Sequence, residues 1–167
     1  MKGTRSDSIL LRECQDNVEI VTMNNPAKLN ALSNLMLLEL QTCFDEISLK
    51  KEIKTVIIRG NGKAFCAGHD LKEMMASKSD ADGGKVAMVD LFNRCSKMMQ
   101  TIQMMPQPVL AQVNGLATAA GCQLVATCDM AVASAEALFG VNGVNIGLFC
   151  STPMVALTRN IPKKHEI

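Results

Sequence analysis

Gly62-Lys-Ala-Phe-Cys-Ala-Gly-His-Asp-Leu-Lys-Glu-Met74 is the stretch that decides the fold of this chain. The apolar run Thr55-Val-Ile-Ile-Arg59 comes before it and predicts a strand, which leads in through Gly60-Asn-Gly62. Asp70 is a good N-cap for a helix that begins at Leu71. A strand, a glycine turn and a capped helix leave backbone N–H groups unpaired. Such groups can bind an anion, or an oxygen that becomes negative during a reaction.

A second segment of the chain has the same organisation. The apolar run Val109–Val113 predicts a strand, and a turn of small residues then leads into a helix expected over residues 119–127. The turn and helix start read Asn114-Gly-Leu-Ala-Thr-Ala-Ala-Gly-Cys-Gln-Leu124. Together the two junctions are a stronger signal for a binding site than either one alone.

Strands alternate with helices along the rest of the chain, which indicates an α/β layered fold. We expect a hairpin turning at Asp16-Asn17, a helix capped by Ser33 that runs to about Lys50, and a loop or mobile lid over residues 77–84. Two helices carry apolar stripes that we assign to the core: Leu37, Leu40, Phe44 and Ile47 on the first, and Met88, Phe92, Cys95, Met99 and Ile102 on the second (85–105). The remaining expected elements are strands at 9–13, 18–23, 130–133 (buried) and 138–139, and a helix that starts at Pro153.

Composition excludes several classes of function. The chain has 167 residues and a formal net charge of +1, and its 17 basic residues are scattered, which argues against nucleic-acid and membrane-surface partners held by charge. No run is long and apolar enough for a transmembrane helix, and the N-terminus has no signal core or convincing presequence. The seven cysteines include no CxxC, and there are only two histidines, so we expect reduced, mostly buried thiols and no metal site.

Four segments carry a resemblance to a known family. Ala64-Phe-Cys-Ala-Gly-His-Asp-Leu71 resembles the first oxyanion-hole motif of the crotonase, or enoyl-CoA hydratase/isomerase, superfamily, and Pro108–Gly115 with Ala119-Ala-Gly-Cys122 resembles the second. Asn25-Pro-Ala-Lys-Leu-Asn-Ala-Leu32 is similar to its CoA-contacting loop. A later loop matches at Phe139-Gly140 and Gly147. Gly-His-Asp-Leu, Ala-Ala-Gly-Cys-Gln-Leu and Gly-Leu-Phe-Cys-Ser-Thr-Pro are the segments typical of one branch of the family.

The resemblance implies a crotonase spiral of repeated ββα units over residues 1–167, as a single, incomplete domain. Family members normally continue beyond this point with helices that cover the acyl site and form a homotrimer. We therefore expect a truncated copy, which argues against trimer assembly by this chain and even against independent folding. The resemblance also implies a mitochondrial location, with the cytosol as the alternative because no presequence is seen.

The resemblance assigns the two oxyanion-hole donors to the backbone N–H groups of His69 and Ala120. Such donors stabilise the enolate oxygen of a thioester. Ala119 and Ala120 replace glycines that are common in the family, and Ala120 suits its role if its φ is negative. The His69 side chain either transfers protons or merely packs while its N–H acts, and Asp70 is either a helix cap or a catalytic acid.

The main departure from the family pattern concerns proton transfer. Family hydratases use two glutamates, which align with Gln123 and Gly143 here. A glutamine amide cannot exchange a proton near neutral pH, and glycine has no side chain. Ordinary enoyl-CoA hydration is therefore not expected, and Glu73 and Glu136 are interpreted as surface charges.

The expected ligand is a CoA thioester, with no permanently bound cofactor and no metal. By resemblance Lys28 either pairs with a CoA phosphate or is simply solvated, and the groove for the ligand is assigned to Ala31, Ala64, Ala67, Gly68, Asp70, Leu71 and Gly121. The sequence thus predicts an acyl-CoA-binding protein of fatty-acid and lipid metabolism, a pseudoenzyme or one with an unidentified base. The alternatives are a non-catalytic partner or regulatory subunit of a full-length relative, and a hydratase with another acid/base pair.

Overall fold

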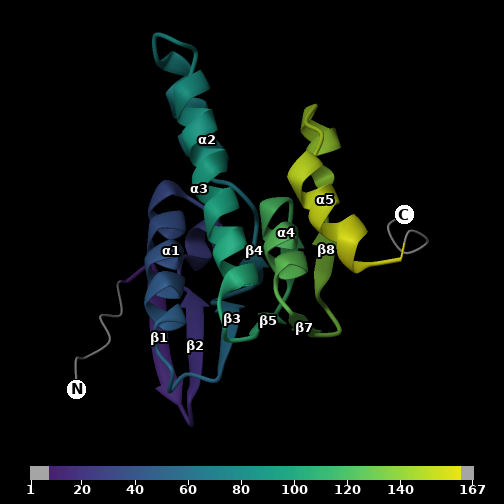
Figure 1. The fold of residues 1–167 in the computed structure, drawn as a ribbon. Helices are drawn as coiled ribbons and strands as arrows, with labels where there is room; N and C mark the ends of the chain where they lie inside the picture. Colours follow the sequence, from purple (N-terminus) through teal and green to yellow (C-terminus); the bar gives the residue numbers. More distant parts are fainter. Residues whose placement is uncertain (1–7, 163–167) are drawn as a thin grey trace.

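The computed structural model describes residues 8–162, and their strands form two sheets with five helices around them (Figure 1). The first sheet has the order β1-β2-β3-β5-β7 and the second β4-β6-β8. The strands are β1 (Leu10–Gln15), β2 (Val18–Met23), β3 (Thr55–Gly60), β4 (Ala64–Cys66), β5 (Val109–Val113), β6 (Leu116–Thr118), β7 (Met130–Ala133) and β8 (Leu138–Gly140). The helices are α1 (Asn34–Ser48), α2 (Leu71–Ala76), α3 (Lys85–Met104), α4 (Ala120–Thr127) and α5 (Ser151–Asn160), with 3-10 turns η1 (Pro26–Lys28), η2 (Ser77–Ser79) and η3 (Asn142–Ile146).

The chain repeats one ββα unit. β3, β5 and β7 are parallel neighbours in the first sheet, and β4, β6 and β8, which follow each of them, are parallel neighbours in the second. Helices α2 and α3 follow the pair β3 and β4, helix α4 follows β5 and β6, and helix α5 follows β7 and β8. This confirms the predicted α/β spiral of ββα units. Because parallel strands in one sheet end at a common edge, the turns after β4 and β6 lie side by side.

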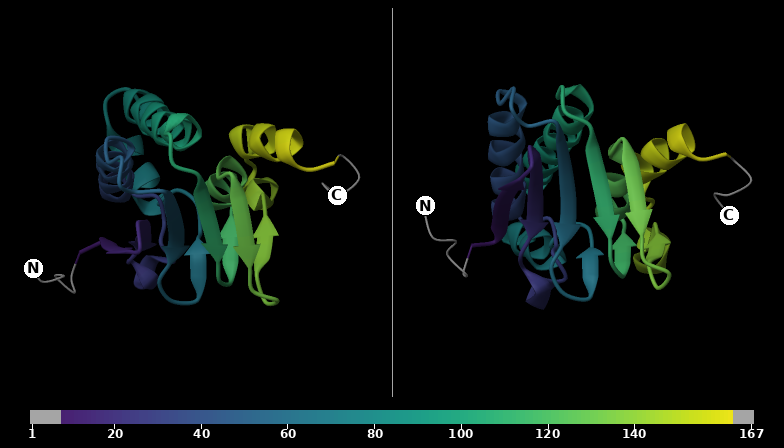
Figure 2. Two further views of the ribbon diagram at one scale, coloured as in Figure 1. Left: turned by 60° about the horizontal axis from the view of Figure 1, so that its bottom comes forward. Right: turned by 90° about the horizontal axis from the view of Figure 1, so that it is seen from below.

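The core lies between the first sheet and the helices on its face (Figure 2). The expected stripe of α1 is buried in full, and Ser33 accepts a hydrogen bond from the Met36 N–H at 3.2 Å as its N-cap. The hairpin turns at Asp16-Asn17, both with positive φ, as a tight two-residue turn requires. Fully buried side chains such as Phe44 and Phe65 each contribute about 2–3 kcal/mol through removal of apolar surface from water.

Two expectations about burial are wrong. On α3 the buried side chains are Leu91, Cys95, Met98, Met99 and Ile102, whereas Phe92 is 45% exposed and Met88 only half-buried. The N-terminal part of α3 rises with α2 above the sheets, beyond the reach of α1 (Figure 1). All four residues of β7 are exposed because β7 is the edge strand of its sheet and no described element covers its faces.

Other elements differ in their bounds or were not expected from periodicity. α4 begins at Ala120 rather than at 119, and α5 begins at Ser151, two residues before Pro153. β4 and β6 have three residues each, too few for an alternating pattern to be visible. Within residues 8–162, no helix is both long and apolar enough to cross a membrane.

Candidate functional site

The turns that follow β4 and β6 meet at one point. Gly68 has a φ of +87°, a conformation that favours glycine. A Cβ atom placed on it would lie 3.0 Å from the Ala119 Cβ and 3.2 Å from the Ala120 backbone nitrogen. The two segments singled out in the sequence are therefore in contact through their backbones, and any side chain at position 68 would push them apart.

Both predicted donors lie at this contact. Ala120 is the first residue of α4, so its N–H has no acceptor within the helix. Its backbone is helical, so its φ is negative, as its predicted role as a donor requires. Ala119, just before it, has φ 50° and ψ −123°, an unusual conformation for a residue with a Cβ. His69 forms an isolated parallel bridge with Leu32, whose N–H donates to the Gly68 carbonyl at 2.8 Å.

A cavity of about 760 Å³, here called the main cavity, opens beside the two turns. Seven residues predicted to form the site line it: Lys28, Ala31, Ala67, His69, Asp70, Leu71 and Ala120. Gly143, which aligns with a family glutamate, lines it too. Most of the other described lining side chains are apolar. The volume and lining are typical of a site for a small molecule with an apolar portion.

Four predicted residues lie near the main cavity without lining it. Ala64 is buried in β4, and Gly68 is in the turn contact. Gly121 packs α4 onto β4, since a Cβ at this position would lie 2.1 Å from the Cys66 carbonyl oxygen. Gln123 is half-buried on α4, where its N–H donates to the Ala119 carbonyl at 3.0 Å.

The His69 ring is held at the wall of the main cavity. It packs edge-on against Phe92, with the ring centroids 5.4 Å apart and an interplanar angle of 88°. Its Nδ1 atom is buried and has no hydrogen-bond partner among the described residues. Burial lowers the pKa of His69, partly offset by the Leu32 backbone. The imidazole is therefore neutral at pH 7, the form in which one ring nitrogen can accept a proton.

Asp70 caps α2, as the sequence predicted. Its Oδ1 accepts hydrogen bonds from the N–H groups of Lys72 at 3.0 Å and Glu73 at 3.4 Å, and its Oδ2 pairs with the Lys28 ammonium at 2.8 Å. The hydrogen bond to Lys28 lowers the pKa of Asp70, and the same bond raises the pKa of Lys28. Lys28 is 52% exposed at the rim of the main cavity, and it pairs with a carboxylate rather than being simply solvated. Its pairing with a CoA phosphate stays a prediction.

The two carboxylates interpreted as surface charges have different positions. Glu136 is exposed, as expected. Glu73 is half-buried, and its Oε2 accepts a hydrogen bond from the Asn34 N–H at 2.8 Å, which ties α2 to the start of α1. Neither residue lines the main cavity.

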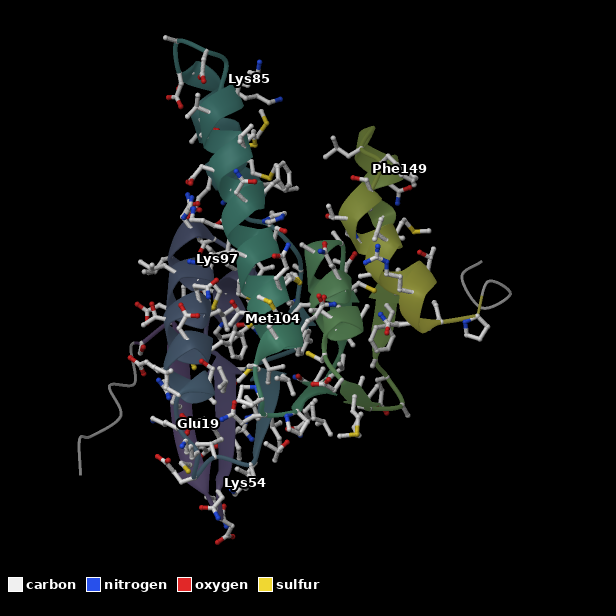
Figure 3. The ribbon with its side chains drawn as sticks, in the orientation of Figure 1. Glu19, Lys54, Lys85, Lys97, Met104 and Phe149 are labelled. Atoms are coloured by element: carbon white, nitrogen blue, oxygen red, sulfur yellow. The ribbon has the colours of Figure 1, made fainter. Side chains whose placement is uncertain are left out.

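Sequence reasoning missed the apolar and thiol side of the main cavity. Met74, Phe92, Leu148, Phe149 and Cys150 line it without having been given a role there. Figure 3 shows Phe149 above α5, on the side of the molecule opposite α3. The signal was present for three of these residues, because Leu148, Phe149 and Cys150 belong to the Gly147–Pro153 segment typical of one family branch.

Comparison with known proteins agrees with this geometry. The family model described as enoyl-CoA hydratase/isomerase matches residues 13–166. This chain belongs to that family. It is 46% identical over 159 residues to the zebrafish (Danio rerio) enoyl-CoA hydratase domain-containing protein 3, mitochondrial, covering 95% of this chain and 53% of the relative. The human (Homo sapiens) protein of the same name is 47% identical over 149 residues, covering 89% of this chain and 48% of the relative.

Solved structures of family members have the same fold. An enoyl-CoA hydratase from Mycobacterium smegmatis aligns with a TM-score of 0.88 at 46% identity, over 96% of this chain and 61% of that one. Human enoyl-CoA hydratase domain-containing protein 3 aligns with a TM-score of 0.86 at 44% identity, over 94% and 60%. The expected resemblance to one branch of the family is thus confirmed. The chain spans about half the length of the curated relatives it matches.

Proposed function

We propose that this chain binds an acyl-CoA thioester in the main cavity, with the thioester oxygen directed at the N–H groups of His69 and Ala120. The observation that carries the proposal is the backbone contact between the Gly68 turn and the Ala119-Ala120 turn beside a largely apolar cavity. Two fixed N–H groups can stabilise a carbonyl oxygen that gains negative charge. Lys28 and Lys72 at the cavity rim supply positive charge for an anionic ligand.

Ordinary hydration of an enoyl-CoA is not part of the proposal. Gln123 and Gly143 stand where the family resemblance places the two glutamates, and Gln123 does not line the main cavity. Loss of each general acid or base costs a factor of about 10²–10⁴ in rate. The chain therefore acts as an acyl-CoA binder in fatty-acid and lipid metabolism. The names of its relatives include the word mitochondrial, which supports that location for this chain, with the cytosol as the alternative.

Calorimetric titration of CoA, butyryl-CoA and crotonyl-CoA into the purified chain tests binding. Leu71→Glu places a negative charge in the cavity lining and should weaken binding of the anionic ligand about tenfold or more. Val86→Glu is the matched control, because Val86 is also an exposed apolar helix residue and does not line the cavity. Absence of binding by the folded wild-type chain, or equal loss in both variants, contradicts the proposal.

The absorbance of crotonyl-CoA at the enoyl thioester band tests the chemistry. The wild-type chain should leave crotonyl-CoA unhydrated, whereas sustained turnover would mean that another acid/base pair is present. Gln123→Glu with Gly143→Glu should gain activity only if position 143 can accommodate a side chain. A Cβ there would lie 2.6 Å from the Cys150 Sγ and 2.7 Å from the Leu148 carbonyl oxygen. Cys150→Ala removes the first of these two clashes, so the double variant is tested both with and without it, and a gain of activity also requires the backbone at Leu148 to move.

A partner-subunit role is the second candidate, favoured by the apolar edge formed by β7 and β8. Met130, Val132, Leu138 and Phe139 on these strands are 50–65% exposed. Exposed apolar strand edges of this kind are typical of interaction surfaces. Light scattering behind a sizing column would show association of the chain with itself or with a full-length relative, and Val132→Glu should abolish it.

A further inference from the structure

Five of the seven cysteine thiols are held unreactive by burial. Burial raises the pKa of Cys43, Cys66 and Cys128 to about 12 and that of Cys95 to about 11, and it also raises the pKa of Cys122. A thiol reacts as its thiolate, so these five react slowly near neutral pH. The other two are Cys14, exposed on β1, and Cys150, half-buried in the lining of the main cavity.

The Cys150 thiol lies against Gly143, and both residues line the main cavity. Its Sγ is 2.6 Å from the point where a Cβ on Gly143 would be, so it fills the space that a side chain at position 143 would take. Burial and, to a smaller extent, the nearby Cys150 thiol raise the pKa of Cys122, which lies in the first turn of α4. The strand before Gly143 is bonded to the turn that precedes α4, because the Ala119 N–H donates to the Gly140 carbonyl at 2.9 Å.

We infer that Cys150 accepts the acyl group of a thioester bound in the main cavity, forming S-acyl-Cys150 and releasing CoA. The inference rests on the proposed function, because it needs the thioester in that cavity. It adds a covalent acceptor to a site so far described only by its backbone donors. Cys150, Ser151 and Thr152 line the cavity together, and of these a thiol is the strongest nucleophile near neutral pH.

The step is a transthioesterification that needs no oxidant or co-reactant. The Cys150 sulfur forms a bond to the carbonyl carbon, and the carbonyl oxygen becomes negative beside the N–H groups of His69 and Ala120. The bond between that carbon and the CoA sulfur then breaks. The proton of the Cys150 thiol ends on the CoA thiol, and the neutral imidazole of His69 in the same cavity is a group that can carry it.

The test is intact-mass and peptide mass spectrometry of the full chain incubated with butyryl-CoA, followed by hydroxylamine, which cleaves thioesters. Cys14 is the internal control, because it is an exposed thiol far from the main cavity. We expect Cys150 to be acylated at least about tenfold faster than Cys14, since binding places the thiol beside the carbonyl. Cys14→Ser should leave the Cys150 rate unchanged.

Binding and acylation are measured separately so that the two ideas can fail independently. Cys150→Ser is titrated with butyryl-CoA by calorimetry and should bind it without becoming acylated. If the chain binds butyryl-CoA but Cys150 is acylated no faster than Cys14, the inference is overturned and the proposed function stands. If neither the wild type nor Cys150→Ser binds butyryl-CoA, the proposed function fails and the inference fails with it.

Discussion

Replacing Ala119 by glycine should stabilise the chain. Ala119 has φ 50° and ψ −123°, where a Cβ clashes with neighbouring backbone atoms. Glycine has no Cβ and adopts this conformation without the clash. Such a conformation costs about 1–3 kcal/mol for a residue with a side chain. The alanine persists because the turn is fixed from both sides, by the Ala119 N–H to Gly140 bond and by contact with Gly68.

Two opposing terms reduce the gain from Ala119→Gly. Glycine loses about 0.5–1 kcal/mol more backbone entropy on folding than alanine does. Removing a half-buried methyl group costs a few tenths more, less than the ~0.8 kcal/mol of a fully buried one. The net increase in the free energy of unfolding is about 1 kcal/mol, which in a chain of this size raises Tm by about 3 °C.

The assay is urea unfolding followed by circular dichroism, with Ala126→Gly as the matched control. Ala126 lies in α4, the helix that Ala119 precedes, in ordinary helical backbone, so glycine there should lower the free energy of unfolding by about 1 kcal/mol. The two variants should thus move in opposite directions. Equal destabilisation by both would show that Ala119 is not strained, and the account of this turn would be wrong.

Three further predictions concern the elements around the site. Asp70→Asn should flatten the loss of stability between pH 5 and pH 2. The lowered pKa of Asp70 means that its ion pair with Lys28 stabilises the fold above the ordinary aspartate pKa and is lost as pH falls through the folded value. The effect is small because Lys28 is half-exposed. Acid titration of both proteins, followed by circular dichroism, checks it, and identical curves would contradict it. Asn30→Ala should cost about 3 kcal/mol in urea unfolding, because the fully buried amide hydrogen-bonds three backbone groups, at Asn25, Asn61 and Ala64, at 2.8–2.9 Å. Gly121→Ala should cost about 3 kcal/mol or more by forcing a Cβ into the Cys66 carbonyl, and a Tm equal to that of the wild type would refute the tight packing of α4 on β4.

The order of elements was predictable from local signals, and the burial of their faces was only partly so. Alternation and capping located the hairpin, α1 and the strands β3 and β5, because these signals lie within a few residues. Periodicity on α3 gave the right stripe from Cys95 onward. It failed at Phe92 because burial depends on what packs against each face of a helix: Phe92 lines the main cavity, whereas its neighbour Leu91 is buried in the core. β7 was misjudged for the same reason, since apolar composition does not tell an edge strand from a central one.

In the site, too, the features that depend on local sequence were predictable and those that depend on tertiary packing were not. The donors at His69 and Ala120 are backbone groups of turns, and the Asp70 side chain caps the helix that follows the first turn. Short sequence motifs specify both kinds of feature. The ion pair between Lys28 and Asp70 joins residues 42 positions apart, and the cavity lining at Phe92 and Phe149 comes from separate elements. No local pattern encodes such distances, so only the fold reveals them.

Gly143 connects the two proposals made for this chain. The absence of a side chain there removes a possible acid or base, and the same absence leaves the space in which the Cys150 Sγ lies. Any Cβ at position 143 would meet both this sulfur and the Leu148 carbonyl oxygen within 2.7 Å, so the segment carrying Cys150 would have to move. Gly143→Ala should therefore lower the acylation rate of Cys150 at least about tenfold while the affinity for butyryl-CoA changes less, because the two N–H donors on the β4 and β6 turns are untouched. A variant that kept the full acylation rate would show that the thiol does not depend on the space at Gly143, and the link between lost proton transfer and a gained acyl acceptor would be broken.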